Sequence, residues 1–224
     1  MTAPDEVPPR PPFGPRLWPA WAALGLAVLA AHLPWLWQRA IGRGVGWLAL
    51  HLAGTRRRAA QANIELCFPE QSPQWRARLL RDSFDALGVG LFEFARAWWG
   101  GLGPIRSHVR IEGLEHLRAL QEQGRGVLLV SGHFMTLEMC GRLLCDHVPL
   151  SGMYRVHRNP VMEWAVKRGR LRYAGAMYGN GDIRGAVRHL KRGGLLWYAP
   201  DQDMRGPDTV FAPFFGAPPS PTTA

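Results

Sequence analysis

His133 and Glu138 are the residues of this 224-residue chain whose types and spacing best suit acid–base chemistry. They follow an apolar run, Val127 to Ser131, that is typical of a buried strand, and Gly132 allows a sharp bend into a following helix. Five residues rotate a helical side chain by about 500°, so the two side chains meet only if His133 lies in the turn and Glu138 in the first helical turn. An imidazole backed by a carboxylate can take a proton from an alcohol. The spacing predicts His133 as a general base that Glu138 orients.

The elements around this pair alternate between strands and helices from about residue 107. Strands are predicted at 108–113, 127–131, 149–154 and 195–199, and helices at 114–124, 136–146, 160–172 and 183–192. This order predicts an α/β fold with a mostly parallel sheet covered by helices, and functional groups at the carboxyl ends of the strands. Since His133 and Asp201 each follow a strand, we expect both at that edge.

A helical region precedes the α/β part. Residues 59–68 are predicted to be helical up to Pro69, and Ser72-Pro73 is typical of the start of a long helix that ends at Gly100-Gly101. The apolar residues of that long helix recur at helical spacing, and they include Phe94 and Trp98. This stripe suits a protein core and also an acyl-chain groove, and the sequence does not separate the two.

An uncharged segment lies near the start of the chain. Residues 17–38 contain no Lys, Arg, Asp or Glu, and as a helix they would span about 33 Å, enough for a bilayer core of roughly 30 Å. We therefore expect a helix that spans the membrane or dips into it, after a disordered proline-rich stretch at 1–16. Arginines are more frequent after this segment than before it, which predicts a cytoplasmic location for everything after residue 39. The triplet at 56–58 is expected to contact anionic headgroups.

Composition limits the partners. The formal net charge is +10 and the isoelectric point about 10.7, which favours anionic partners such as acidic lipid, an acidic carrier protein or nucleic acid. No known nucleic-acid motif is present, so we expect no nucleic-acid partner. The odd count of three cysteines fits a reducing compartment. No second histidine stands at a zinc-ligand spacing from His133, so neither a metal nor another cofactor is expected.

Five blocks of sequence carry a resemblance to a known family. They are NIELCFPE (63–70), SGHFMTLEM (131–139), YRVHRNPVMEWAVKRGR (154–170), LLWYAPDQD (195–203) and VFAPFFG (210–216). By the order and spacing of these blocks, the chain resembles the late acyltransferases of lipid A biosynthesis, the lauroyl and myristoyl transferases. These belong to a wider group of membrane acyltransferases with a His-x4-Asp/Glu motif. The resemblance covers nearly the whole chain from Trp18 onward.

The resemblance implies an activity and further site residues. It implies transfer of a fatty acyl chain from acyl carrier protein to a hydroxyl of a lipid A precursor, at the inner membrane of a Gram-negative bacterium, without a cofactor. Arg170 becomes the candidate cation for the developing oxyanion, and Asp201 a residue that orients Arg170 or the acceptor. Substrate-binding roles are implied for Tyr154, Arg155, Asn159 and Arg205. Arg205 lies slightly earlier than the arginine that many members carry before the VFxPFF block.

The expected organisation has four parts: a disordered N-terminus (1–16), a membrane helix (17–38), a helical juxtamembrane region (39–104) and a catalytic α/β domain (105–224). Family members continue beyond the final PSPTTA, so we expect a C-terminally truncated catalytic domain. Two other functions remain open. One is a glycerophospholipid-type acyltransferase, although NIELCFPE and YAPDQD argue against it. The other is a non-catalytic membrane-tethered protein whose basic face binds acidic lipid or carrier protein.

Overall fold

The computed structural model describes residues 10–201 and 215–216, and these divide into two compact units. The first unit holds the described residues within Met1–Leu33 and Glu93–Gln202, and the second those within Pro34–Phe92 and Asp203–Ala224. One boundary falls inside the long helix α4 (Pro73–Trp99). This division differs from the expected one at 104/105, because the N-terminal helix and the end of α4 group with the sheet.

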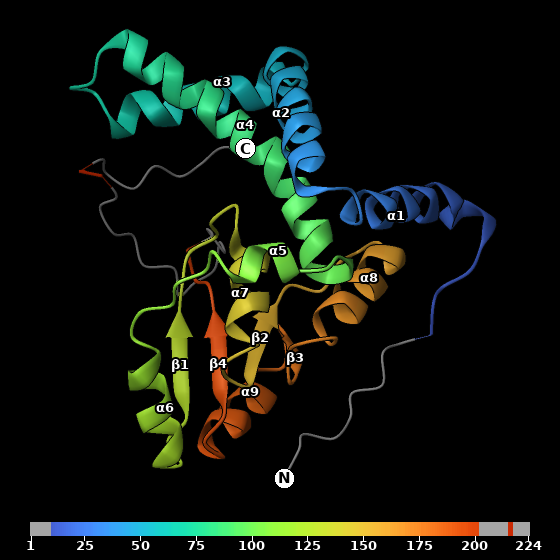
Figure 1. The fold of residues 1–224 in the computed structure, drawn as a ribbon, viewed down its shortest axis with the longest axis vertical. Coiled ribbons are helices and arrows are strands. Elements are labelled where there is room, and N and C mark those ends of the chain that lie inside the picture. Colours follow the sequence, from blue (N-terminus) through green and yellow to red (C-terminus); the bar gives the residue numbers. More distant parts are fainter. Residues whose placement is uncertain (1–9, 202–214, 217–224) are drawn as a thin grey trace. The chain divides into compact units, whose positions relative to one another are not determined.

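A four-stranded parallel sheet forms the centre of the first unit (Figure 1). Its strands are β1 (Val127–Val130), β2 (Leu150–Tyr154), β3 (Met177–Gly179) and β4 (Leu195–Tyr198). They are ordered β1-β4-β2-β3, and every neighbouring pair is parallel. The predicted parallel α/β sheet is thus confirmed. All carboxyl ends lie at one edge, with β4 between β1 and β2.

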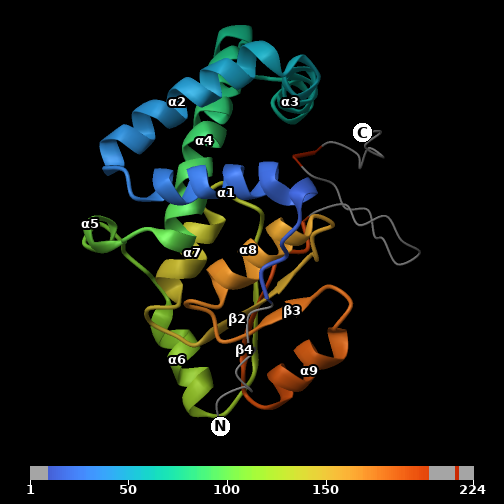
Figure 2. The same ribbon diagram turned by 90° about the vertical axis from the view of Figure 1, so that its right-hand side faces the viewer.

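Helices cover the sheet because each strand alternates its side chains between two faces. Helices α6 (Leu114–Glu122) and α7 (Leu137–Leu144) lie on one side and α9 (Ile183–Lys191) on the other (Figure 2). On the α6–α7 side, Leu150 and Leu195 are almost fully buried in one apolar cluster. The β4 strand is therefore a central, buried strand.

A second apolar cluster lies beside the carboxyl edge of the sheet. It joins residues of α7 and β2 to α8 (Pro160–Arg170) and to the last turns of α4. Trp98 is 2% exposed and Val161 is fully buried there. The aromatic stripe of α4 thus belongs, at Trp98, to the core of the first unit. The short η1 (Pro15–Leu17), α1 (Trp18–Ala31) and the short α5 (Gly103–Arg106) also belong to this unit.

The single helix expected over 17–38 is wrong. The structure has α1 (Trp18–Ala31), of 14 residues, then a break at 32–34 and a new helix, α2 (Trp35–Leu52). Pro34 lacks the N–H of a continuing helix and disfavours helical backbone at the residue before it. At about 1.5 Å per residue, α1 is only about 21 Å long. Among the described residues, no helix combines the length and apolarity needed to cross a bilayer.

Two further expectations differ from the structure. The strand expected at 108–113 is irregular backbone that leads into α6, and its Arg110 and Glu112 pair on the surface with side chains 85% and 75% exposed. Alternating residue types alone do not make a strand where no neighbouring strand pairs with them. The sequence predicted no strand at β3, because three residues are too short to show a periodic pattern.

The second unit is built from α2, α3 (Gly54–Cys67) and the first part of α4. The start of α4 confirms the expected cap, because Ser72 Oγ accepts a hydrogen bond from the N–H of Trp75 at 3.2 Å. Gly42 and Gly46 of α2 face Gly88 and its neighbours on α4, and a Cβ added at Gly42 would lie 2.8 Å from the Cα of Val89. Backbone therefore packs directly on backbone, which only glycine permits.

This glycine contact makes a stability prediction. Gly42→Ala should destabilise the protein by roughly 1–3 kcal/mol, because the new methyl group overlaps rigid backbone. Gly44→Ala on the same helix meets nothing within 4 Å, so better helix propensity should leave stability unchanged or raise it by up to about 1 kcal/mol. Chemical denaturation of both variants measures the difference. Equal stability of the two would refute the close packing.

Candidate active site

His133 and Asp201 are hydrogen-bonded to each other at the carboxyl edge of the sheet. Val130 of β1 is in register with Tyr198 of β4, and each of the two residues lies three positions beyond its strand. His133 Nδ1 lies 2.6 Å from Asp201 Oδ1, and the backbone N–H of His133 donates to Asp201 Oδ2 at 2.7 Å. Adjacent parallel strands thus bring together two residues that are 68 positions apart. The expectation that both stand at this edge is confirmed.

The pair has a defined electrostatic state. Hydrogen bonds from the backbone and ring of His133 lower the pKa of Asp201, so this carboxyl group is ionised at neutral pH. Because the folded-state pKa is lowered, the stabilisation by the pair is lost as the pH falls through that value. An ionised Asp201 accepts from Nδ1–H, which leaves Nε2 of His133 as the ring nitrogen that can accept a proton. The side chains are 41% and 44% exposed, so solutes reach the pair.

Gly132 has a different role from the one expected. Its φ is not in the left-handed region, so no unusual backbone bend requires glycine. A Cβ at this position would instead lie 3.3 Å from Asp201 Oδ2 and 3.3 Å from the ring of Phe134. The missing side chain makes room for the carboxylate of Asp201 beside the backbone of His133.

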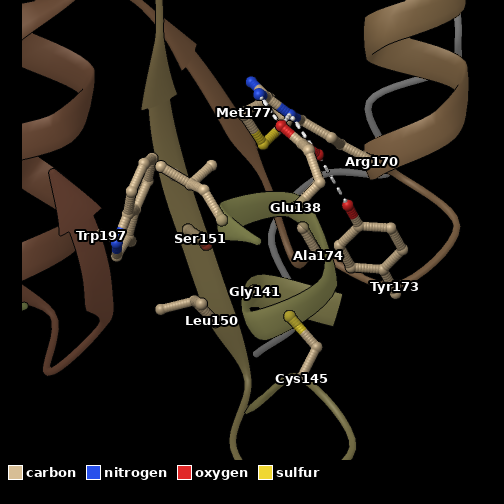
Figure 3. Close-up of a pocket in the computed structure, with 12 residues that line it drawn as sticks. Glu138, Gly141, Cys145, Leu150, Ser151, Arg170, Tyr173, Ala174, Met177 and Trp197 are labelled. Atoms are coloured by element: carbon tan, nitrogen blue, oxygen red, sulfur yellow. Dashed lines mark hydrogen bonds and ion pairs between the residues drawn. The ribbon is translucent and has the colours of Figure 1, made fainter. Parts of the chain in front are cut away.

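Glu138 lies in the first turn of α7, as expected, but its partner is Arg170. The Arg170 Nε lies 3.1 and 3.2 Å from the two carboxylate oxygens, and its Nη2 makes a closer contact with Oε1. Trp98 Nε1 donates to Glu138 Oε2 at 2.7 Å, and the Tyr173 hydroxyl donates to the same oxygen at 3.3 Å. Figure 3 shows Glu138 between Arg170 and Tyr173, with its carboxylate facing the guanidinium.

The neighbouring Glu138 keeps the buried Arg170 guanidinium charged. The side chains of Glu138 and Arg170 are 5% and 17% exposed. Burial lowers the pKa of Arg170, but the charge and hydrogen bonds of Glu138 outweigh it, and the net pKa is raised. Burial and the nearby Glu138 charge raise the pKa of Tyr173, so its hydroxyl remains a donor. Arg170 is therefore a fixed cation at neutral pH.

The direct His133–Glu138 pairing expected from the spacing is wrong in this structure. The two residues do come from the predicted turn and the predicted first helical turn. However, His133 bonds to Asp201 and Glu138 bonds to Arg170. Asp201 correspondingly bonds to the histidine, where the resemblance implied that it orients Arg170 or the acceptor. Two acid–base pairs stand in place of one.

His133 and the Glu138–Arg170 pair border one hollow. A cavity of about 280 Å³ is lined by His133, Glu138 and Arg170, with Phe134, Met135 and Trp197 among its apolar walls. A smaller cavity of about 50 Å³ shares the Glu138–Arg170 pair and continues among Leu150, Ala174, Met177 and other apolar side chains (Figure 3). The guanidinium and carboxylate thus line both the larger pocket that His133 borders and the smaller apolar one.

The expected substrate-binding residues are placed differently. Tyr154 is buried, and its hydroxyl donates to Glu163 at 2.6 Å although it lines the larger cavity. The Asn159 side chain caps α8 by accepting from the N–H of Val161 at 2.9 Å. Arg155 is exposed on the loop after β2. Arg205 lies outside the described residues.

Sequence reasoning missed Trp98 and Tyr173 as partners of Glu138. Trp98 was assigned to the apolar stripe of α4, and its N–H gives no signal in a hydrophobic pattern. Tyr173 follows the RGR of the third resemblance block by three positions. Within 10–201 and 215–216, no three His, Cys, Asp or Glu side chains cluster as metal ligands would.

Comparison with known proteins decides the family. The family model described as bacterial lipid A biosynthesis acyltransferase matches residues 13–224. The chain belongs to this family. The predicted resemblance is confirmed, and the His133–Asp201 and Glu138–Arg170 pairs are therefore features of a lipid A acyltransferase family member.

Curated members of the lipid A acyltransferase family are similar over most of this chain. The Escherichia coli (strain K12) palmitoleoyltransferase is 39% identical over 201 residues, covering 90% of this chain and 66% of that protein. The lauroyltransferase of the same strain is 38% identical, covering 93% and 68%. A Haemophilus influenzae lipid A acyltransferase is 36% identical, covering 94% and 68%. The chain thus spans about two thirds of the length of these relatives.

Proposed function

We propose that this protein transfers a fatty acyl chain from acyl carrier protein to a hydroxyl of a lipid A precursor. The observation that carries the proposal is the pocket that holds an Asp-oriented histidine and a fixed arginine cation together. The histidine can take the proton of a hydroxyl group, and the arginine can stabilise the negative charge of an oxyanion. The curated relatives are named for acyl transfer in lipid A biosynthesis.

His133 begins the reaction. Its Nε2 takes the proton of the acceptor hydroxyl while Asp201 stabilises the resulting imidazolium. The alkoxide oxygen attacks the thioester carbonyl carbon and forms a tetrahedral intermediate. When that intermediate collapses, the carbon–sulfur bond breaks, and His133 returns its proton to the departing thiolate. The products are an ester and free carrier thiol, so neither an oxidant nor a nucleotide is consumed.

Arg170 stabilises the oxyanion of that intermediate. Its contacts with Glu138 use Nε and Nη2, and the side chain also lines the pocket that His133 borders. Loss of one such donor typically raises the barrier by about 3–4 kcal/mol. Glu138 therefore serves the reaction by holding Arg170, and the apolar cavity beyond the pair is suited to the first carbons of the acyl chain.

The charge of the protein supports the proposed partners. The net charge of +10 favours an acidic carrier protein and a phosphorylated glycolipid. Arg155, His157 and Arg158 are exposed on the loop that follows β2, at the same sheet edge as the active-site pairs. These side chains are placed to meet anionic groups of either substrate.

Helix α2 supports a membrane surface as a further partner, in line with a location at the bacterial inner membrane. Gln38, Gly42 and Gly46 are buried, whereas its large apolar side chains face outward: Leu36, Trp37, Trp47 and Leu52 are 60–74% exposed. Small residues inside and large apolar residues outside are typical of helices that contact lipid. Residues 35–64 contain five arginines and no acidic residue, which suits anionic headgroups.

Vesicle binding tests this membrane contact. Replacing Arg56, Arg57 and Arg58 together with Gln should weaken binding to phosphatidylglycerol vesicles roughly a hundredfold, at about 1 kcal/mol per basic side chain. Arg110→Gln, also exposed but in the other unit, is the matched control and should bind as the wild type does. Co-sedimentation at low salt measures both. Unchanged binding by the triple variant would contradict the contact.

The transfer reaction itself is tested with defined substrates. Purified full-length protein is incubated with acyl-loaded carrier protein and one of two acceptors, a phosphorylated di-glucosamine precursor or lysophosphatidic acid. The products are identified by mass spectrometry. Gain of one acyl chain by the glucosamine precursor alone is the expected result. Acylation of lysophosphatidic acid alone would favour the glycerophospholipid reaction, and binding without turnover would favour a non-catalytic protein.

A further inference from the structure

We propose that Trp98 is a positioning residue for acyl transfer, because its indole N–H fixes the Glu138 carboxylate in the orientation that holds Arg170 at the pocket. The expected effect on the transfer rate rests on the proposed function. The positioning of Glu138 and Arg170 by the indole rests on the contacts alone. It also gives the last turns of α4 a role beyond that of apolar packing.

The indole N–H makes the shortest of the three hydrogen bonds that Glu138 Oε2 accepts. That bond is 2.7 Å long, compared with 3.2 Å from Arg170 Nε and 3.3 Å from the Tyr173 hydroxyl. Arg170 Nη2 makes its close contact with the other oxygen, Oε1. One carboxylate oxygen is thus held mainly by the indole and the other by the guanidinium. Together they fix the carboxylate plane, and that plane sets the direction of the guanidinium.

Close packing fixes the indole in turn. Trp98 is 2% exposed, and its ring lies 4.3 Å from the Phe94 ring and 5.1 Å from the Trp99 ring, centroid to centroid. A Cβ added at Gly169 would lie 2.6 Å from the Trp98 ring. Since Gly169 directly precedes Arg170, the indole also rests against the backbone from which the guanidinium extends.

The indole therefore acts on Arg170 by two routes. Through Gly169 it sets the backbone at the end of α8, and through Glu138 it sets the far end of the arginine side chain. Without the indole N–H, Glu138 Oε2 loses its shortest hydrogen bond. A buried carboxylate with an unsatisfied charge is costly, so the Glu138 side chain reorients toward other donors. The carboxylate then turns, and the guanidinium turns with it. A displaced cation stabilises the oxyanion less while substrate binding changes little.

Substitution of Trp98 with Phe separates the donor from most of the packing. We expect kcat to fall about 10- to 100-fold, the range for a hydrogen bond to a charged group, with KM within about threefold of the wild-type value. Trp164→Phe is the matched control. Trp164 is also a partly buried tryptophan, and its ring packs against Trp21 rather than against Trp98. Its kcat should stay within about twofold of the wild-type value. Equal kcat in Trp98→Phe and wild type would overturn the proposal.

A second replacement keeps the shape of the bicyclic ring. Benzothienylalanine at position 98 has sulfur where tryptophan has N–H, so it packs like the indole but donates no hydrogen bond. The same fall in kcat is expected with an unchanged melting temperature. This variant decides the kinetic question if Trp98→Phe does not fold. A wild-type kcat here would show that only packing matters, and that result would overturn the proposal.

An NMR measurement tests the contact without any turnover. In ¹⁵N-labelled protein, the indole proton missing from Trp98→Phe identifies the Trp98 resonance. We expect this resonance to lie downfield and to move when Glu138→Gln removes the acceptor charge, whereas the Trp164 resonance stays in place. A Trp98 resonance that Glu138→Gln leaves unmoved would overturn the inference. Absence of transfer by the wild type would instead refute the proposed function, so the two failures are distinguishable.

Discussion

Asp201→Asn is expected to lower the rate of acyl transfer by about 10⁴-fold while the protein remains folded. The carboxylate accepts two hydrogen bonds from His133, one from the ring Nδ1–H at 2.6 Å and one from the backbone N–H at 2.7 Å. An amide keeps the size but neither balances the imidazolium nor enforces the tautomer with Nε2 unprotonated. The matching change in a serine protease triad costs about 10⁴-fold. Single-turnover transfer per folded molecule measures the loss.

The control for this change is Asp182→Asn. Asp182 is also an exposed aspartate, and it caps α9 by accepting from the N–H of Gly185 at 2.9 Å. Asn is an equally good cap, so both stability and rate should stay at wild-type values. If Asp201→Asn transferred acyl chains as fast as Asp182→Asn, the orienting role of Asp201 would be refuted.

Arg170→Met is expected to damage both stability and activity. It removes the cation from a pair whose side chains are 17% and 5% exposed and leaves the Glu138 carboxylate buried without its counter-charge. Such a loss typically destabilises a protein by about 3–5 kcal/mol, which corresponds to a fall of roughly 6–20 °C in melting temperature. The folded fraction should transfer acyl chains 10²- to 10³-fold more slowly, because the oxyanion loses its donor.

Two comparisons make this prediction specific. Arg106→Met breaks the Arg106–Asp146 pair, whose side chains are 51% and 30% exposed, and should cost at most about 1 kcal/mol. The double variant Glu138→Gln with Arg170→Met removes both charges, so it should recover much of the lost stability but none of the activity. Calorimetry and transfer assays are needed on all four proteins. A melting temperature of Arg170→Met equal to that of Arg106→Met would contradict a structural role for the pair.

Local pattern was sufficient to predict most of the sheet unit. The apolar runs at β1, β2 and β4 and the amphipathic stretches at α6 to α9 are signals carried by neighbouring residues. The break between α1 and α2 was missed because hydropathy outweighed the backbone chemistry of Pro34. The strand predicted at 108–113 is absent for a different reason. Its pattern is local, but a strand needs a partner elsewhere in the chain.

The candidate site shows the same limit in its side-chain partners. Spacing predicted His133 and Glu138, and the family resemblance implied Arg170 and Asp201, but the contacts among these four residues differ from those expected. Which acid meets the histidine depends on β4 lying next to β1, a contact between residues 68 positions apart. The bond from Trp98 to Glu138 spans 40 positions. Such pairings depend on sheet order and helix packing, and no short motif encodes them.

The central claim is that His133 takes the proton of the acceptor hydroxyl, and transfer by His133→Ala tests it most directly. The assay is single-turnover acyl transfer from loaded carrier protein to the glucosamine precursor, per folded molecule, with folding verified by thermal melting. Since the side chain is 41% exposed, the variant should fold. We predict a loss of at least about 10⁴-fold in rate at an almost unchanged melting temperature. Wild-type turnover by well-folded His133→Ala would contradict the account.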